Sequence, residues 1–122
     1  MAKKILIVDD SPVIIMSLKQ TLEMASYEVL TASDGTEALA SIKGGIRPDL
    51  IITDINMPHM NGLDFIKNVR PLMRFVPILI LTTESEAAKR DEAKKLGATG
   101  WIVKPAQGPD LLAVVKQVLP GA

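Results

Sequence analysis

Three aspartates follow runs of apolar residues in an arrangement that could support chemistry. Asp9 and Asp10 come directly after the apolar run 5–8, and Asp54 comes directly after residues 50–53, of which the first three are apolar. Three carboxylates held close together repel one another, and a bound cation relieves that repulsion. The chain has no cysteine and a single histidine. A set of oxygen ligands without thiolates favours a hard cation, Mg²⁺ before Ca²⁺.

A divalent cation beside carboxylates and a lysine makes a site for a phosphoryl group, because both cations neutralise charge on its oxygens. Lys104, after the apolar run 101–103, is the lysine that would complete this site. A carboxylate can itself attack phosphorus and give an aspartyl phosphate. These residue types therefore predict phosphoryl transfer. The alternative for each acid alone is a structural role, with Asp10 capping a helix and Asp54 making a turn.

Short apolar runs that alternate with longer helical patterns must position these residues. Most of the runs are apolar at consecutive positions, which favours a parallel sheet covered on both faces. The predicted strands are residues 5–8, 28–31, 50–53, 78–81 and 101–103. Helix starts are predicted at Ser11-Pro12, at a capping box over 34–37, at Asn61-Gly62 and at Pro109-Asp110, and a helix over 85–96 is predicted to end before a capping Gly97.

Five strands and five helices in strict alternation predict an α/β domain with right-handed crossovers. In such folds ligands bind beyond the carboxyl ends of the strands, where the strand order reverses. The doubly wound order 2-1-3-4-5 would make the first and third strands neighbours there, so that the three aspartates converge. Thr82, Thr83 and Lys104 stand at the ends of the fourth and fifth strands and would complete the same rim.

The composition excludes several classes of protein. A length of 122 residues suits one domain, residues 1–122, and 48% apolar with 23% charged residues is a globular profile. Lys plus Arg and Asp plus Glu both number 14, so there is no basic excess for binding nucleic acid directly. No apolar run is long enough for a membrane span or for a signal peptide. We expect a cytoplasmic protein, with a monomer as the default.

Four segments occur in order from one end of the chain to the other. They are ILIVDDS at 5–11, ITDINMP at 52–58 followed by Asn61-Gly62, PILILT at 77–82 and GATGWIVKP at 97–105. Each segment alone is a weak signal, but the ordered set is specific. It resembles a response-regulator receiver domain, and among these the single-domain chemotaxis type. The resemblance implies a flavodoxin-like fold with a five-stranded parallel sheet in the order 2-1-3-4-5.

The resemblance also implies roles for individual residues of the site. Asp54 resembles the aspartate that accepts a phosphoryl group. Asp9 and Asp10 resemble the acids that hold Mg²⁺ together with Asp54 and the backbone carbonyl of Asn56. Lys104 resembles the lysine that contacts the phosphoryl oxygens.

The resemblance implies further roles in switching and in loss of the phosphoryl group. Thr82 resembles the hydroxyl residue that moves towards the phosphoryl group, although Thr83 competes for that role. Trp101 occupies the aromatic switch position, and its structural alternative is an aromatic that covers an edge strand. Asn56 and Glu84 occupy positions that tune dephosphorylation in similar receivers.

The chain departs from the receiver pattern at three positions. Thr83 stands where receivers usually have Ala, Ala106 stands where many have Phe, and Trp101 replaces the commoner Tyr or Phe. His59 is interpreted as a solvated loop residue rather than a ligand or base.

The function implied is a switch of two-component signalling. A sensor histidine kinase of the chemotaxis (CheA-like) type would phosphorylate Asp54, and no metabolic substrate would be turned over. The output would be docking to a protein, such as a flagellar motor switch component or a phosphotransfer protein, because no DNA-binding segment follows the last helix. The residues predicted for docking are Lys89, Arg90, Lys94, Lys95 and Trp101, for which a solvated helix face is the alternative.

Three other functions stay open from the sequence. A phosphorelay intermediate would pass its phosphoryl group on to a second histidine. A pseudo-receiver would act only by binding and would never be phosphorylated. A small phosphohydrolase would use Asp9 as its nucleophile, although such enzymes generally need a cap domain or long insertions to enclose a substrate.

Overall fold

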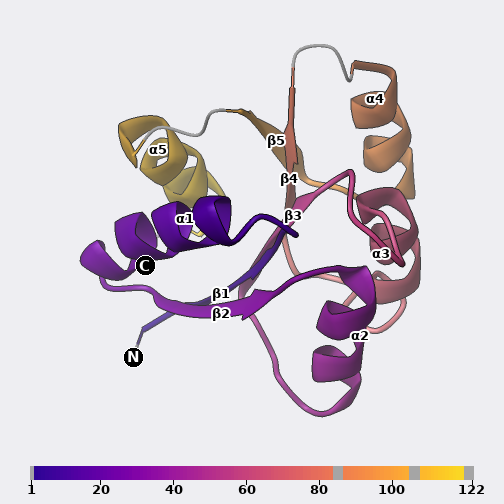
Figure 1. Ribbon diagram of the computed structural model, residues 1–122, viewed down its shortest axis with the longest axis horizontal. Coiled ribbons are helices and arrows are strands. Elements are labelled where there is room, and N and C mark those ends of the chain that lie inside the picture. The colour runs from indigo at the N-terminus through magenta and orange to yellow at the C-terminus, as the bar shows by residue number, and fades with distance from the viewer. Residues whose placement is uncertain (1, 84–86, 105–107, 120–122) are drawn as a thin grey trace.

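Strands and helices alternate along the whole of the computed structural model, which describes residues 2–83, 87–104 and 108–119. The described residues form the five strands and five helices predicted, so the α/β fold class is confirmed (Figure 1). Each strand is one residue longer than the predicted segment. In chain order the elements are β1 (Lys4–Val8), α1 (Pro12–Met24), β2 (Glu28–Ala32), α2 (Gly35–Lys43), β3 (Leu50–Asp54), α3 (Gly62–Val69), β4 (Ile78–Thr82), α4 (Ala87–Leu96), β5 (Gly100–Val103) and α5 (Gly108–Val118).

The sheet is parallel throughout and has the order β2-β1-β3-β4-β5, which confirms the order implied by the resemblance. Val8 at the end of β1 lies opposite Ala32 on one side and Thr53 on the other. In the next pair, Asp54 at the end of β3 lies opposite Leu81 of β4. The carboxyl ends of β1, β3 and β4 therefore meet at one edge of the sheet.

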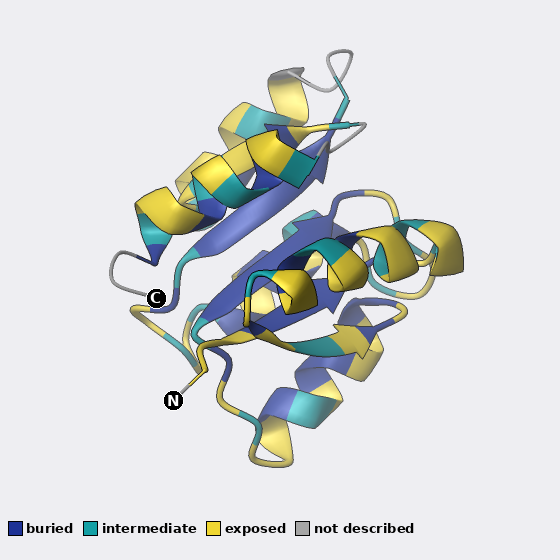
Figure 2. Cartoon of the chain, turned by 90° about the vertical axis from the view of Figure 1, so that its left-hand side faces the viewer, coloured by how far each residue is buried: buried dark blue, intermediate teal, exposed yellow. Residues whose placement is uncertain are grey.

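Helices cover both faces of the sheet, with α1 and α5 on one face and α2, α3 and α4 on the other (Figure 1). Successive side chains of a strand point to opposite faces. Along β1, Leu6 and Val8 pack into the core under α2, α3 and α4, whereas Ile5 and Ile7 pack into the core under α1 and α5. Figure 2 shows the buried strands enclosed by helices whose outer faces are exposed. Burial on both faces explains why the central strands β1, β3 and β4 are apolar at consecutive positions.

Side-chain caps begin three of the helices at the predicted positions. Ser11, Asp34 and Asn61 each accept a hydrogen bond from the backbone N–H three residues further on. The predicted capping box forms only in part. The Glu37 carboxylate accepts from the backbone N–H and hydroxyl of Ser33, one residue before the cap, where a capping box would return to the cap residue. Ser33 offers two donors to one carboxylate oxygen, which favours this arrangement.

The two C-terminal helices also lie close to their predicted positions. α4 ends at Leu96, and Gly97 follows with φ +116°, a backbone conformation that favours glycine. The predicted start of α4 at Ser85 lies outside the described residues. α5 begins at Gly108, one residue before the predicted Pro109. In the part of the chain described here, none of the helices combines the length and apolar character of a membrane span.

Candidate functional site

The three aspartates converge at the carboxyl edge of the sheet, as predicted. Asp9 follows β1, Asp10 is its exposed neighbour, and Asp54 is the last residue of β3. Each of them offers a carboxylate oxygen, and these oxygens lie within 4.8 Å of one another. Asp9 and Asp54 are both buried. The site therefore gathers three acidic groups where little water reaches two of them.

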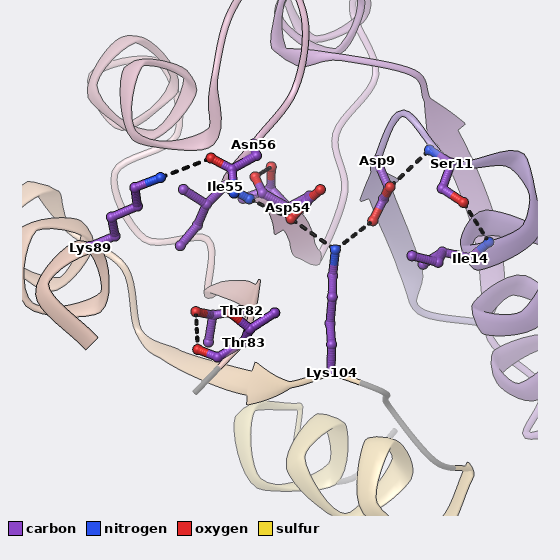
Figure 3. A network of polar contacts seen from close by, with 11 residues as sticks. Asp9, Ser11, Ile14, Asp54, Ile55, Asn56, Thr82, Thr83, Lys89 and Lys104 are labelled. Atoms are coloured by element: carbon purple, nitrogen blue, oxygen red, sulfur yellow. Dashed lines mark hydrogen bonds and ion pairs between the residues drawn. The ribbon is translucent and has the colours of Figure 1, made fainter. Parts of the chain in front are cut away.

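Lys104 reaches this cluster from the end of β5 (Figure 3). Its Nζ lies 3.0 Å from Oδ1 of Asp54 and 3.8 Å from Oδ2 of Asp9. A hydrogen bond from the backbone N–H of Lys104 to the carbonyl of Thr82, 2.7 Å long, fixes where the lysine leaves the sheet edge. The predicted partnership of Lys104 with the acids is thus present. An ammonium bonded to the Asp54 oxygen is positioned to neutralise negative charge that is added there.

The Asp9 carboxylate is buried and only partly hydrogen-bonded. Its Oδ1 accepts a hydrogen bond of 2.9 Å from the backbone N–H of Ser11, but its buried Oδ2 has no hydrogen-bond partner among the described residues. The 3.8 Å to Lys104 allows an ion pair and is too long for a hydrogen bond. Burial raises the pKa of the Asp9 carboxyl, and the neighbouring carboxylates of Asp54 and Asp10 raise it further.

An unpaired buried carboxylate oxygen beside two more carboxylates is what a divalent cation would satisfy. The donors are all oxygens, as Mg²⁺ prefers. The residues present therefore fit the magnesium site predicted from the sequence. The carboxylates that would hold the ion are those of Asp9, Asp10 and Asp54, and the backbone carbonyl of Asn56 is the fourth predicted ligand.

The loop between β3 and α3 is held tightly against the site. The backbone N–H of Gly62 donates a 2.7 Å hydrogen bond to the carbonyl of Ile55, which closes the loop on itself. A Cβ at position 62 would lie 2.1 Å from the carbonyl oxygen of Asp54. Only glycine permits so close an approach. The backbone N–H of Ile55 in turn donates to Oδ1 of Asp54, at 2.8 Å, and orients that carboxylate.

Thr82 is the last residue of β4 and is fully buried, whereas Thr83 is half-buried. In this structure the hydroxyl of Thr82 donates to the backbone carbonyl of Thr83, 3.1 Å away. Figure 3 places both threonines on the side of the site formed by the end of β4. Thr82 ends the strand and stays the predicted switch residue.

A model of the response regulator receiver domain family matches residues 5–116 of the chain. The chain belongs to this family. Receiver domains are signalling domains rather than metabolic enzymes, they typically bind Mg²⁺ at an acidic pocket, and they act between a histidine kinase and downstream targets.

Relatives of this receiver domain fall into two kinds. Chemotaxis protein CheY1 of Helicobacter pylori is 44% identical over 105 residues, which cover 84% of this chain and 85% of that protein. The solved structure of chemotaxis protein CheY4 of Vibrio cholerae is 48% identical, with a TM-score of 0.91 and coverage of 97% of this chain and 99% of that one. The alkaline phosphatase synthesis transcriptional regulatory protein PhoP of Bacillus subtilis is 39% identical over 119 residues. Those residues are 98% of this chain but only 49% of PhoP, so the receiver domain spans about half of that relative.

Trp101, at the predicted switch position of the receiver domain, lies on the surface. It is 44% exposed, and the guanidinium carbon of Arg90 on α4 lies 5.1 Å from the centre of its ring. This is the geometry of a cation–π contact. The ring is therefore packed against α4 in this structure, and its role as a switch stays a prediction.

The basic residues predicted for docking do not all behave alike. Lys94 and Lys95 are exposed in the last turn of α4, and Arg90 contacts Trp101. Lys89 instead donates a 2.9 Å hydrogen bond to the side-chain oxygen of Asn56, beside the site. The docking face stays a prediction for all five residues. Glu84, predicted to tune dephosphorylation, and Ala106 lie outside the described residues.

His59 is a loop residue with φ +66°, and its side chain is 75% exposed, as the interpretation of a solvated residue requires. Its Nδ1 lies 2.9 Å from Oδ2 of Asp34, which also caps α2. The hydrogen bond from the backbone N–H of Glu37 lowers the pKa of Asp34, and the bond to His59 lowers it further. No sequence pattern indicates this pair, because its members are 25 residues apart on different loops.

Proposed function

We propose that this receiver domain is a phosphorylation-controlled switch that accepts a phosphoryl group on Asp54 from a histidine kinase. The observation that carries the proposal is the 3.0 Å contact of Lys104 with an oxygen of a buried Asp54, within a cluster of three carboxylates. A binding module without phosphoryl chemistry would gain nothing from burying mutually repelling acids, which cost stability unless they are compensated.

The transfer would begin with attack of an Asp54 carboxylate oxygen on the phosphorus of a phosphohistidine. A P–O bond forms as the P–N bond breaks, and the electron pair of that bond returns to the imidazole nitrogen, which then takes up a proton. Lys104 would neutralise part of the charge on the transferred oxygens. Mg²⁺, when bound by Asp9, Asp10 and Asp54, supplies further positive charge for the same purpose.

The added negative charge would then bias the domain between two conformations. A phosphoryl group on Asp54 interacts with the ammonium of Lys104 and offers new acceptors to the hydroxyl of Thr82. Because the group can favour only the state with which it interacts better, the response is a shift of population. The proposed output surface comprises α4, β5 and α5, with Trp101 on β5.

The CheY relatives support a chemotaxis role, in which this domain acts alone in the cytoplasm between a chemotaxis kinase and a protein target such as a motor switch component. A monomer is the expected state. The PhoP relative shows that similar domains also occur within longer transcriptional regulators. In either setting this chain would use the same site, so the partner and not the chemistry would distinguish the two roles.

The test is the intact mass of the protein after incubation with acetyl phosphate, with and without Mg²⁺. We expect the gain of one phosphoryl group that requires Mg²⁺ and is absent from Asp54→Ala. Asp64→Asn, an exposed acid on α3, is the matched control and should gain the group as the unchanged protein does. No gain in folded protein would favour the pseudo-receiver, and a gain that persists in Asp54→Ala would identify a different nucleophile.

A further inference from the structure

A long side chain of α4 joins the loop that follows the predicted phosphorylation site. Lys89 Nζ donates a 2.9 Å hydrogen bond to Oδ1 of Asn56, although the two residues are 33 positions apart. Both side chains are exposed, and both lie at the outer rim of the buried Asp54 carboxylate. Figure 3 shows Lys89 approaching Asn56 from one side of Asp54, while Lys104 and Asp9 lie on the other.

We propose that Lys89 is a positioning residue that holds the Asn56 amide and thereby slows hydrolysis of phospho-Asp54. The proposal rests on the function proposed above and adds a residue that sets how long the phosphoryl group persists. Lys89 acts through Asn56 and not on the phosphorus itself.

The reaction that this contact restrains is attack by water. A water oxygen forms a new bond to phosphorus, the bond from phosphorus to the Asp54 oxygen breaks, and the electron pair returns to the carboxylate. The proton lost by the water leaves to solvent, and hydrogen phosphate is released. Attack is faster when a nearby acceptor orients the water and takes a hydrogen bond from it.

The Asn56 Oδ1 is a neutral acceptor two residues beyond Asp54. In this structure it accepts from the Lys89 ammonium, a charged donor that competes with a water molecule for this oxygen. The same bond ties the loop after β3 to α4 and fixes the orientation of the amide. Asp54 is itself buried, whereas the two side chains that make this bond are exposed to water. Removing the ammonium would take this donor away from the Asn56 oxygen and break the link between the loop and α4.

The test is the decay of phospho-Asp54 in Lys89→Met, which keeps most of the length of the side chain and removes its donor. Protein is phosphorylated with acetyl phosphate and Mg²⁺ and freed of the donor, and the phosphorylated fraction is followed by intact mass. We expect decay about fivefold faster than in the unchanged protein, the effect of one ordinary solvent-exposed hydrogen bond. Lys67→Met, which removes an exposed lysine from α3, is the matched control and should decay at the unchanged rate.

Two further variants separate positioning from a general effect of charge. Lys89→Arg restores a charged donor and should return the decay most of the way to the unchanged rate. In an Asn56→Ala background, Lys89→Met should have no additional effect, because the group through which it acts is gone. An unaltered or slower decay in Lys89→Met, or an equal acceleration in the Asn56→Ala background, would overturn the proposal.

A measurement on the unphosphorylated protein tests the contact directly. The side-chain amide signal of Asn56, assigned by its loss in Asn56→Ala, should shift in nitrogen-15 correlation spectra of Lys89→Met and stay in place in Lys67→Met. If the unchanged protein gains no phosphoryl group, the proposed function and this inference both fail. If it gains the group and Lys89→Met decays at the unchanged rate, only this inference fails.

Discussion

The two ends of the sheet differ in how fully their polar groups are hydrogen-bonded. Near the amino ends of β4 and β5, the guanidinium of Arg70 donates to four backbone carbonyls from two different loops. At the carboxyl edge, three carboxylates crowd together, and one oxygen of Asp9 has no hydrogen-bond partner among the described residues. One end is electrostatically satisfied and the other is not.

This difference shows where the fold serves stability and where it serves chemistry. The carbonyls that Arg70 joins belong to Met73, Arg74 and Val76 after α3 and to Gly97 after α4, so one side chain connects two loops. The carboxyl edge places like charges close together, so that a bound cation or an added phosphoryl group changes the electrostatic repulsion among them. A charged ligand has most effect where the charged groups of the protein lack partners of their own.

The largest effect expected at the satisfied end is that of Arg70→Ala. This substitution removes the charged guanidinium, so the carbonyls of two loops lose their hydrogen-bond donor. The free energy of unfolding should fall by about 3 kcal/mol. Urea denaturation measures the loss. Arg74→Ala is the control, because Arg74 is exposed and its side chain makes no hydrogen bond shown among the described residues. Phosphorylation of the folded Arg70→Ala protein should persist, and its loss would break the division between the two ends.

A smaller effect is expected from Gly62→Ala at the carboxyl edge. The new Cβ would lie 2.1 Å from the carbonyl oxygen of Asp54, so the loop must move, at a cost of about 2 kcal/mol in unfolding free energy. Movement of the loop should also slow phosphorylation by acetyl phosphate. Gly45→Ala is an informative control, because no atom lies within 4 Å of a Cβ there and only its φ of +120° opposes the change. A Gly62→Ala protein with unchanged stability would mean that this loop is looser than its contacts indicate.

Magnesium should stabilise the carboxyl edge by relieving its repulsion. An ion that binds only the folded state at ten times its dissociation constant adds about 1.4 kcal/mol to the free energy of unfolding. The measurement is the urea midpoint with Mg²⁺ and again after chelation. Asp9→Asn should lose most of this gain, whereas Asp64→Asn should keep it. An equal gain in Asp9→Asn would place the ion elsewhere.

The sequence was sufficient to predict the elements of the fold and the acids of the site. Strands buried on both faces leave apolar runs that are easily recognised, and acids directly after such runs must lie at the carboxyl edge whatever the strand order. That Asp9 and Asp54 are neighbours required the order itself, which came from the family resemblance. The roles of Thr82 and Trp101 rest on the same resemblance.

Contacts made by long side chains between distant loops could not be predicted. Arg70 reaches Gly97, Lys89 reaches Asn56 and His59 reaches Asp34, each pair 25 to 33 positions apart. Periodicity reports which side chains are buried, but it does not report which loop a flexible polar side chain will reach. From the sequence Lys89 is therefore indistinguishable from its basic neighbours on α4, and only the structure shows its contact with Asn56.

The smallest effect expected is that of Asp9→Asn. It should stabilise the protein, whereas most substitutions destabilise the proteins that carry them. Asp9→Asn keeps an oxygen that can accept from Ser11 and removes a buried charge beside Asp54, so it should raise the free energy of unfolding by about 1 kcal/mol near neutral pH without Mg²⁺. The facing groups Asp10, Asp54 and Lys104 are present in both proteins. Urea denaturation across a pH series measures the difference.

The sign of the pH dependence follows from the raised pKa of Asp9. Folded protein keeps the Asp9 proton at pH values where unfolded protein has lost it, so the contribution of Asp9 to stability is present below its ordinary pKa of 3.8. That contribution is lost as the pH rises through the higher pKa of the folded state. Asn does not titrate, so the advantage of Asp9→Asn should be near zero in acid and should grow through this window. Saturating Mg²⁺ should reverse the order at neutral pH, because the ion needs the charge that the substitution removes. If the difference in the free energy of unfolding between the two proteins did not change with pH, repulsion among the carboxylates would not be what limits stability at the carboxyl edge.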